Sequence, residues 1–195
     1  MKYQEACFSA TYDEARQKFR RLARARGFTL ESLPINVDWD DDLTIDVAYY
    51  QAPRANQKHN VFLHISGTHG VEGFSGSAIQ LDFLRNFKKI RPTLESTNTT
   101  LILVHILNPY GMKYSRRFNE HNVDLNRNFI LDRKERLNLM QNPSPLFMKL
   151  NPWLNPNTPQ RNCEQSIGDK FQLGKLALLE EHSELKQVTA GGQYA

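Results

Sequence analysis

The sequence has few cysteines, no long apolar run and no basic, apolar leader at its start. Cys7 and Cys163 lie far apart without CxxC spacing, which gives little support to a disulfide framework or a thiolate metal site. The longest apolar runs, at residues 61–65 and 101–107, are strand-sized, whereas a membrane-spanning helix needs roughly 20 residues. Residues 2–5 are polar and acidic, unlike a secretory signal. We therefore expect a cytoplasmic protein with no membrane span.

The chain of 195 residues is 39% hydrophobic and 24% charged, which is typical of one globular domain with its own core. Its formal net charge of +4 raises the question of nucleic-acid binding, because basic residues crowd between Arg16 and Arg26. A helix explains this crowding: Thr11 and Glu14 form a capping-box pattern, and Gly27 is a good C-terminal stop. The arginines then form the solvated face of that helix, with the acidic run at residues 38–42 close enough to offset them. We expect no nucleic-acid partner.

Apolar periodicity predicts an α/β fold. Strands are expected at residues 28–33, 43–50, 61–65 and 101–107, and helices at residues 11–27 and 74–89. The last two strands are continuous apolar runs of the buried kind, and the helix between them makes them parallel, so that the loops after both open at one edge of the sheet. The first two strands are expected to form an antiparallel edge. We predict a mixed, mostly parallel sheet flanked by helices, with residues 1–195 as a single domain.

The C-terminal third of the chain is less regular. A short helix is expected at residues 131–140, a long proline-punctuated surface loop at 143–159, and a last helix at 168–188.

The turn after the third strand carries the first group of chemically capable residues, S-G-T-H-G-V-E-G. Its His69 and Glu72 stand three residues apart, and an imidazole and a carboxylate in such a turn can converge on one cation, zinc in particular. The glycines allow a tight turn and leave space beside the metal. The alternative is a polar helix entry, with Glu72 in the first turn of the following helix.

The loop after the fourth strand carries the second group, which begins with N-P-Y-G and continues through S-R-R-F-N to D-L-N-R-N-F. An arginine beside an asparagine on a loop over a metal can hold a substrate carboxylate through charge-assisted hydrogen bonds. A further arginine nearer the metal can stabilise the oxyanion that forms when water attacks a carbonyl. The alternative is that these charges only solvate a loop and that Asn108-Pro109 is turn chemistry.

Taken together, G-T-H-G-V-E-G, N-P-Y-G and D-L-N-R-N-F resemble the zinc metallocarboxypeptidase superfamily, and within it a bacterial branch catalogued as a domain of unknown function. The resemblance implies that His69 and Glu72 are the first two zinc ligands and that Asn126 and Arg127 bind the substrate's terminal carboxylate. It also implies that Arg116 or Arg117 is the carbonyl-polarising catalytic residue. The same motifs occur in aspartoacylase-like deacylases, so the implied substrate is a small peptide or an N-acyl amino acid with a free carboxylate.

The sequence departs from this family in what it lacks. Members complete the zinc site with a second histidine on a later strand and use a glutamate near the C-terminus as general base, and neither is recognisable here. His64 and His105 lie inside strands and are expected to be satisfied core residues, His182 is expected on a solvated helix, and His121 is a loose candidate for a substitute ligand. We expect the N-terminal half of a carboxypeptidase-like domain, with weak or absent zinc binding and a separately encoded C-terminal half as a candidate partner. The alternative is an inactive remnant that binds a carboxylate ligand.

Overall fold

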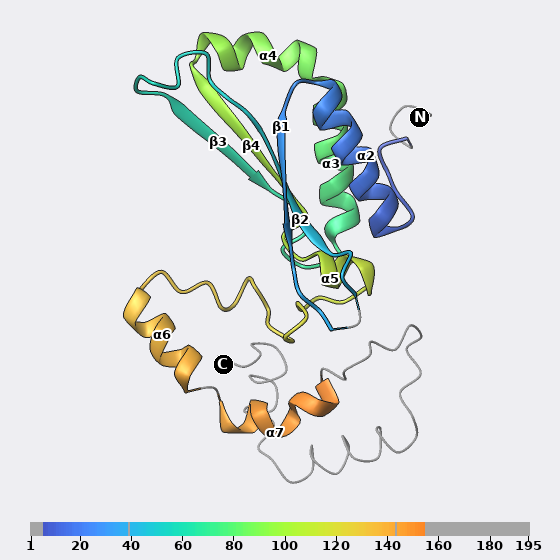
Figure 1. Cartoon of the computed structure of the whole chain (residues 1–195), viewed down its shortest axis with the longest axis vertical. Helices are drawn as coiled ribbons and strands as arrows, with labels where there is room; N and C mark the ends of the chain where they lie inside the picture. The colour runs from blue at the N-terminus through green and yellow to red at the C-terminus, as the bar shows by residue number, and fades with distance from the viewer. Residues whose placement is uncertain (1–5, 39, 143, 155–195) are drawn as a thin grey trace. The chain divides into compact units, whose positions relative to one another are not determined.

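The computed structural model describes residues 6–38, 40–142 and 144–154. The chain divides into two compact units, Met1–Arg117 and Phe118–Ala195, each described separately below. Figure 1 shows the elements of both. The single domain expected from the sequence stays a prediction.

The first unit contains a four-stranded sheet with the order β1-β2-β4-β3. Its strands are β1 (Thr29–Pro34), β2 (Thr44–Tyr50), β3 (Asn60–Ile65) and β4 (Thr99–His105). β1 pairs antiparallel with β2, β2 antiparallel with β4, and β3 parallel with β4. The α/β class and the antiparallel edge are confirmed, but the expectation of a mostly parallel sheet was wrong. Among the described strands only β3 and β4 are joined by a helical crossover, so only that pairing is parallel.

β3 has an apolar sequence of the kind that is typical of a strand buried in the sheet interior. It lies instead at an edge of the sheet within the described residues. Val61, Phe62, Leu63 and Ile65 are between 45% and 57% exposed. An apolar run shows that a strand is suited to burial, but its place in the sheet depends on pairings with distant segments, which the run does not encode.

Three helices cover one face of this sheet: α2 (Tyr12–Ala25), α3 (Gly73–Arg85) and α4 (Phe87–Ser96). Thr11 caps α2 by accepting a hydrogen bond from the Glu14 backbone N–H at 3.2 Å, as the sequence predicted. The helix expected at 74–89 is two helices that meet at Asn86. α2 and α3 lie side by side (Figure 1) and, with α4, β2 and β4, enclose the main core. Its fully buried members include Phe19, Leu81, Leu84, Phe87, Leu101 and Leu103.

The strand residues in this core all belong to one face of the sheet. Ala48 of β2 and Leu103 of β4 are paired neighbours, and both are buried. Their neighbours Val47 and Val104, which point to the opposite face, are only half-buried. In the first unit, α2, α3 and α4 thus bury one sheet face and leave the other in contact with solvent.

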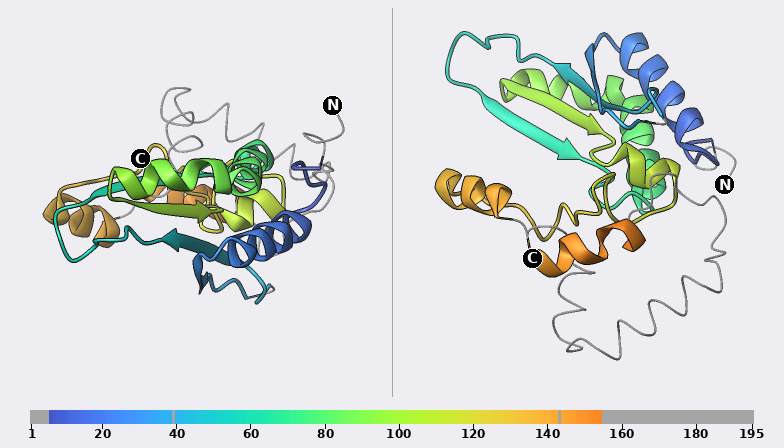
Figure 2. Two further views of the ribbon diagram at one scale, coloured as in Figure 1. Left: turned by 90° about the horizontal axis from the view of Figure 1, so that it is seen from above. Right: turned by 60° about the horizontal axis from the view of Figure 1, so that its bottom comes forward.

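A second, smaller core lies where α2 begins and where β4 ends. The short helix α5 (Pro109–Lys113) contributes Tyr110 and Met112, which pack with Tyr12, Leu43 and Ile106. These side chains hold α5 at the carboxyl ends of β3 and β4. Figure 2 shows both strand arrows leading toward α5.

The basic face of α2 is less solvated than the sequence suggested. Arg16 is only 6% exposed and contacts Asp42 at 2.6 Å, which confirms that the acidic run offsets the arginines. Arg20 forms paired hydrogen bonds of 2.7 and 2.8 Å with Asp46, whose side chain is fully buried. These arginines therefore tie α2 to β2 and to the segment before it.

The second unit contains the helices α6 (Arg133–Gln141) and α7 (Pro145–Leu154). α6 confirms the helix expected at 131–140, and Asp132 caps it by accepting from the Glu135 backbone N–H at 2.7 Å. The prediction of a loop at 143–159 was wrong for residues 145–154, which form α7. Proline is compatible with the first turn of a helix, where Pro145 lies, and the Ser144 hydroxyl caps α7 by accepting a hydrogen bond from the Phe147 N–H. The helix expected at 168–188 lies outside the described residues. In the part of the chain that the structure describes, no helix is long and apolar enough to cross a membrane.

Candidate functional site

The loops that follow β3 and β4 are joined by backbone hydrogen bonds. The Leu107 N–H donates to the Ser66 carbonyl and the Asn108 N–H to the Gly67 carbonyl, both at 2.9 Å. Gly67 has a φ of +67°, and a Cβ there would lie 2.4 Å from the Ile106 side chain. The sequence expectation that these loops open at one edge of the sheet is therefore confirmed by direct contact.

His69 and Glu72 lie together in the first of these loops. His69 Nδ1 is 3.4 Å from Glu72 Oε2, and the side chains are 11% and 67% exposed, respectively. Glu72 occupies the N-cap position of α3, yet its side chain makes no capping hydrogen bond. Glu72 thus stands at the start of α3, as the polar helix entry that rivals the metal interpretation expects, and its carboxylate also lies beside the imidazole, so both interpretations remain open.

Gly70 allows α5 to approach this loop closely. A Cβ at Gly70 would lie 2.0 Å from the carbonyl carbon of Gly111, a distance that no side chain can occupy. A Cβ at Gly111 would in turn lie 2.7 Å from the Arg116 carbonyl oxygen. The two glycines are required at this contact because backbone packs directly against backbone.

Asn108 joins the parts of the site, and its role was not recognised in the sequence beyond turn chemistry. It is 1% exposed, and its Oδ1 accepts from the Gly111 N–H at 2.8 Å, which caps α5. Its Nδ2 donates to the Arg117 carbonyl at 3.2 Å. Asparagine followed by proline is a signature of a helix start, so the signal was present. The contact with Arg117 is tertiary and has no such signal.

Arg116 and Arg117, the candidate carbonyl-polarising residues, follow α5 in the first unit. The Val71 N–H, between His69 and Glu72, donates to the Arg116 carbonyl at 3.0 Å. The Arg116 N–H donates to the Gly111 carbonyl at 2.7 Å. Arg116 is half-buried and Arg117 is exposed. The structure thus places the backbone of both arginines beside the loop that carries the imidazole–carboxylate pair.

Asn126 and Arg127, the candidate carboxylate clamp, lie in the second unit. Both are exposed, and the buried Asp124 organises their turn. Asp124 Oδ1 accepts from the Asn126 N–H at 2.9 Å, and the Asp124 carbonyl accepts from the Arg127 N–H at 3.0 Å. The aspartate of D-L-N-R-N-F therefore shapes the turn that presents the asparagine and the arginine. Their cooperation with the first unit stays a prediction.

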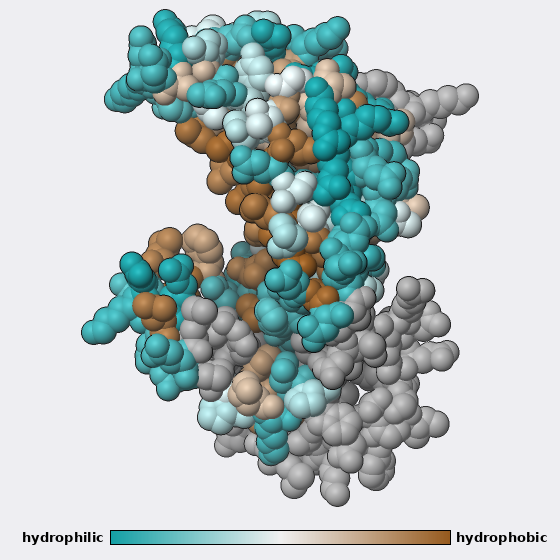
Figure 3. All heavy atoms as spheres, in the orientation of Figure 1, coloured by the Kyte–Doolittle hydropathy of each residue, from teal (hydrophilic) through white to brown (hydrophobic). Residues whose placement is uncertain are grey.

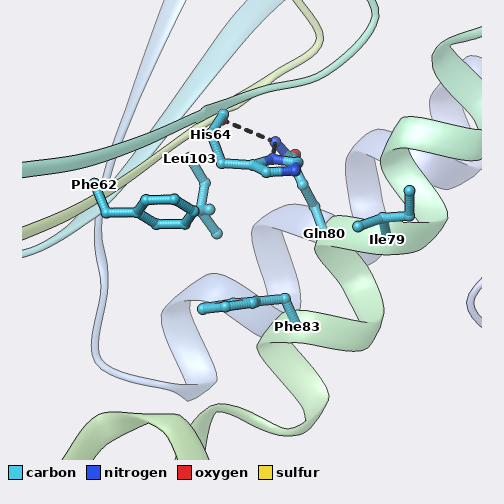
Figure 4. Close-up of a pocket in the computed structure, with 6 residues that line it drawn as sticks. All are labelled: Phe62, His64, Ile79, Gln80, Phe83 and Leu103. Atoms are coloured by element: carbon cyan, nitrogen blue, oxygen red, sulfur yellow. Dashed lines mark hydrogen bonds between the residues drawn. The ribbon is translucent and has the colours of Figure 1, made fainter. Parts of the chain in front are cut away.

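Of the other histidines, His64 has the contacts expected of a structural residue, whereas His121 was the loose candidate for a substitute ligand. His64 Nδ1 is 3.0 Å from Gln80 Nε2, and Figure 4 shows the two side chains against each other in a small apolar pocket. His121 Nε2 lies 3.7 Å from Glu120. His182 lies outside the described residues. Among the residues that the structure describes, no group of three or more histidine, cysteine, aspartate or glutamate side chains is arranged to hold a metal ion.

His105 is the most perturbed titratable group near the site. It is 1% exposed, stacks on Phe19 at 4.3 Å between ring centroids, and its Nε2 is hydrogen-bonded to Ser77 Oγ at 2.8 Å. Burial lowers the pKa of His105 from 6.5 to about 4, with the Asp46 carboxylate opposing this effect and Arg20 adding to it. The grouping of serine, histidine and aspartate resembles a nucleophilic triad, but no substrate reaches a serine that is only 1% exposed. Ser77 and His105 instead form a buried polar contact between α3 and β4.

The model of the family "Protein of unknown function (DUF2817)" matches residues 8–195. A "putative metallopeptidase" from Shewanella denitrificans is 25% identical, with a TM-score of 0.43, over 66% of this chain and 46% of its own. A second "putative metallopeptidase", from Shewanella baltica, is 19% identical, with a TM-score of 0.45, over 86% of this chain and 50% of its own. The chain thus spans about half the length of these solved structures. No curated protein matches it.

Proposed function

The chain belongs to the DUF2817 family, and for it we propose a part in metal-dependent hydrolysis of carboxypeptidase type, directed at an amide bond next to a free carboxylate. The observation that carries the proposal is the His69–Glu72 pair, 3.4 Å apart in the loop at the carboxyl end of β3. Ligands of open α/β proteins bind at this end of the strands. The substrate class is a small peptide or an N-acyl amino acid, the latter as in an aspartoacylase-like deacylase.

The donor set fits a zinc ion in part. Imidazole and carboxylate are two of the ligand types that catalytic zinc takes, and catalytic sites normally use three protein ligands. The Glu72 side chain makes no capping hydrogen bond to α3, although the residue is its N-cap, and Gly70 and Gly73 place no side chain next to the pair. In this proposal His69 and Glu72 are two of the three ligands, and no group of three such side chains is found among the described residues. A zinc ion held there supplies Lewis-acid polarisation of a carbonyl and a bound water of lowered pKa.

The protein groups have separate tasks in this proposal. His69 and Glu72 hold the ion. Arg116 or Arg117, whose backbone is fixed beside the pair by Asn108 and Val71, stabilises the negative charge that develops on the carbonyl oxygen. Asn126 and Arg127 bind and orient the substrate's free carboxylate, with the guanidinium giving two parallel hydrogen bonds.

Binding of a carboxylate ligand without catalysis is the second candidate function. It is favoured by the finding that the described residues hold no group of three metal-binding side chains. In that case Arg127 still binds the carboxylate together with Asn126. His69 and Glu72 then serve only as polar loop residues.

Zinc titration separates the two functions. We expect the purified, chelator-treated chain to bind zinc weakly in calorimetry, and His69→Ala and Glu72→Ala each to reduce the affinity at least tenfold. His59→Ala, at a half-buried histidine whose Nδ1 lies 3.0 Å from the Gln57 carbonyl oxygen, is the matched control. Equal zinc affinity of wild type and His69→Ala refutes the metal site. One zinc retained per chain through dialysis, and lost in His69→Ala, refutes the expectation of weak binding and shows that a further ligand exists.

The carboxylate clamp is tested with an N-acetyl amino acid as the probe. Arg127→Ala is expected to weaken its binding more than Arg117→Ala does, because only Arg127 is assigned to the carboxylate. Arg127→Lys keeps the charge but not the paired hydrogen bonds, so it should recover only part of the affinity. Equal affinity of wild type and Arg127→Ala rules the clamp out, whatever the result with zinc.

A further inference from the structure

The segment between β1 and β2 carries the acidic run at residues 38–42, and the structure divides this run between two helices. Asp42 contacts Arg16 of α2 at 2.6 Å, on a helix whose outer surface is hydrophilic (Figure 3). Asp40 contacts α5 instead and is only 9% exposed, whereas the other aspartates of the run are exposed. Burying a carboxylate is unfavourable unless polar partners replace the lost water. Asp40 is therefore part of a built contact and not of a solvated acidic loop.

The partners of Asp40 are two consecutive residues at the end of α5. Its Oδ2 lies 2.7 Å from Lys113 Nζ and accepts a hydrogen bond of 2.7 Å from the Tyr114 hydroxyl. Lys113 is the last residue of α5, and Tyr114 is its C-cap. Burial raises the pKa of Asp40, but hydrogen bonds, above all those from Lys113 and Tyr114, outweigh burial and hold the pKa below its usual value. The carboxylate is therefore charged at neutral pH, and both side chains that hold the end of α5 donate to a charged group.

Asp40 is itself fixed in place, so it can serve as an anchor. Its backbone N–H donates to the Val37 carbonyl at 3.0 Å, and its Oδ1 accepts from the Asp42 N–H at 3.1 Å. Val37 and Ile35 pack against the second, smaller core, to which α5 also contributes. The end of α5 is thus held by a segment that lies 74 residues away from Tyr114 in the sequence.

The chain that leaves this anchor is the turn of the candidate carbonyl-polarising residues. Ser115, between Tyr114 and Arg116, has a φ of +55°, which is unfavourable for a residue with a Cβ. Such a conformation persists only where the surrounding contacts hold it. The Arg116 carbonyl accepts the 3.0 Å hydrogen bond from the Val71 N–H, in the loop that carries the imidazole–carboxylate pair. The turn is therefore held at two points, at Tyr114 by Asp40 and at Arg116 by Val71.

We propose that Asp40 is a positioning residue of the site: by holding the end of α5, it keeps the arginine turn, residues 115–117, docked on the loop that carries His69 and Glu72. Asp40 acts only through α5 and the arginine turn, without touching an ion or a substrate. Its effect on the chemistry rests on the proposed function, in which the arginine turn supplies the group that stabilises the oxyanion. Its hold on the turn does not.

Amide hydrogen exchange of the full chain, followed by NMR, measures the docking of the turn through the Val71 N–H. Asp40→Asn removes the charge that holds α5, and Tyr114→Phe, the milder variant, removes only a hydroxyl and keeps the ring. Each is expected to speed exchange at Val71 by about tenfold, the effect of losing one hydrogen bond to a charged group. Asp42→Asn is the matched control, because it makes the same change two residues away and weakens the contact with α2 instead. Exchange at Leu103, on the central strand β4, gives the change in global stability.

The comparison of these variants decides whether Asp40 holds the turn. Faster exchange at Val71 than the change at Leu103 accounts for, in Asp40→Asn and Tyr114→Phe but not in Asp42→Asn, supports the proposal. Exchange at Val71 that is unchanged in Asp40→Asn, or that rises equally in Asp42→Asn, overturns it.

Zinc titration of the same variants separates a positioning role from a purely structural one. Loops open at small free energies, so loss of the anchor leaves the turn undocked in a sizeable fraction of molecules. The zinc dissociation constant should then rise by about threefold in Asp40→Asn, because only the docked fraction binds well, and stay unchanged in Asp42→Asn. Faster exchange with an unchanged zinc affinity shows that the contact is structural only and overturns the positioning role. Absence of zinc binding in the wild type refutes the metal site of the proposed function, whereas the exchange result alone decides the hold of Asp40 on the turn.

Discussion

Acid should destabilise this protein well above the range in which its carboxylates titrate, because of His105. Burial lowers its pKa to about 4 in the folded state, whereas its ordinary value, which applies to the unfolded chain, is 6.5. Between these two values the unfolded chain binds the proton and the folded protein does not. The contribution of His105 to stability is therefore complete above pH 6.5 and is lost as the pH falls toward 4.

The magnitude follows from the same two values. One pKa unit corresponds to about 1.4 kcal/mol, so the difference amounts to about 3 kcal/mol. Asp46 raises the pKa and Arg20 lowers it, but both effects are smaller than that of burial. A loss of about 3 kcal/mol is a large share of the 5–15 kcal/mol that stabilises a typical domain.

Urea denaturation followed by circular dichroism, repeated from pH 7.5 to pH 4.5, measures this dependence. His105→Gln is expected to be less stable at pH 7.5, because it loses the ring stacking on Phe19, yet its free energy of unfolding should vary less with pH. His59→Gln, at a half-buried position outside the core, controls for the loss of a histidine as such. A hydrogen bond with Lys18 lowers the pKa of Glu14, and one with Arg16 lowers the pKa of Asp42. These two carboxylates add an acid-sensitive contribution to stability that all three proteins share. Equal slopes for wild type and His105→Gln between pH 6.5 and 4.5 would refute the reasoning.

Three further predictions concern stability. Arg20→Met should lower the free energy of unfolding by about 3 to 5 kcal/mol in urea denaturation, because it leaves the fully buried Asp46 carboxylate without its cation. Gly70→Ala should lower the free energy of unfolding by about 3 kcal/mol or more, because its methyl group meets the backbone of α5. Gly27→Ala has open space around its Cβ position and should lower the free energy of unfolding by only about 1 kcal/mol, because of its positive φ. Asn108→Ala should lower the melting temperature through a loss of about 1 to 2 kcal/mol, because α5 loses its cap. An unchanged melting temperature would show that water replaces the cap.

Much of the local structure could be predicted because its causes are local. Thr11 with Glu14, and Asp132 with Glu135, form caps within four residues of sequence, and both helices begin there. The crossover from β3 to β4 also follows from element order, since a strand, a helix and a strand in succession place the two strand ends at one edge. For this reason His69 and Glu72 could be assigned to the same edge as the loop after β4.

The tertiary structure alone decided which strand lies at the edge and how the site is supported. β3 and β4 are both apolar runs, yet β4 is buried and β3 exposed, because β2 pairs with β4 from a distant part of the sequence. The ion pair between Arg20 and Asp46 could not be predicted either, because the sequence of this helix indicated only a solvated basic face. Sequence patterns report what each segment can bury or cap. Which distant segment supplies the partner depends on packing and pairing across the whole fold, and that is encoded in no single segment.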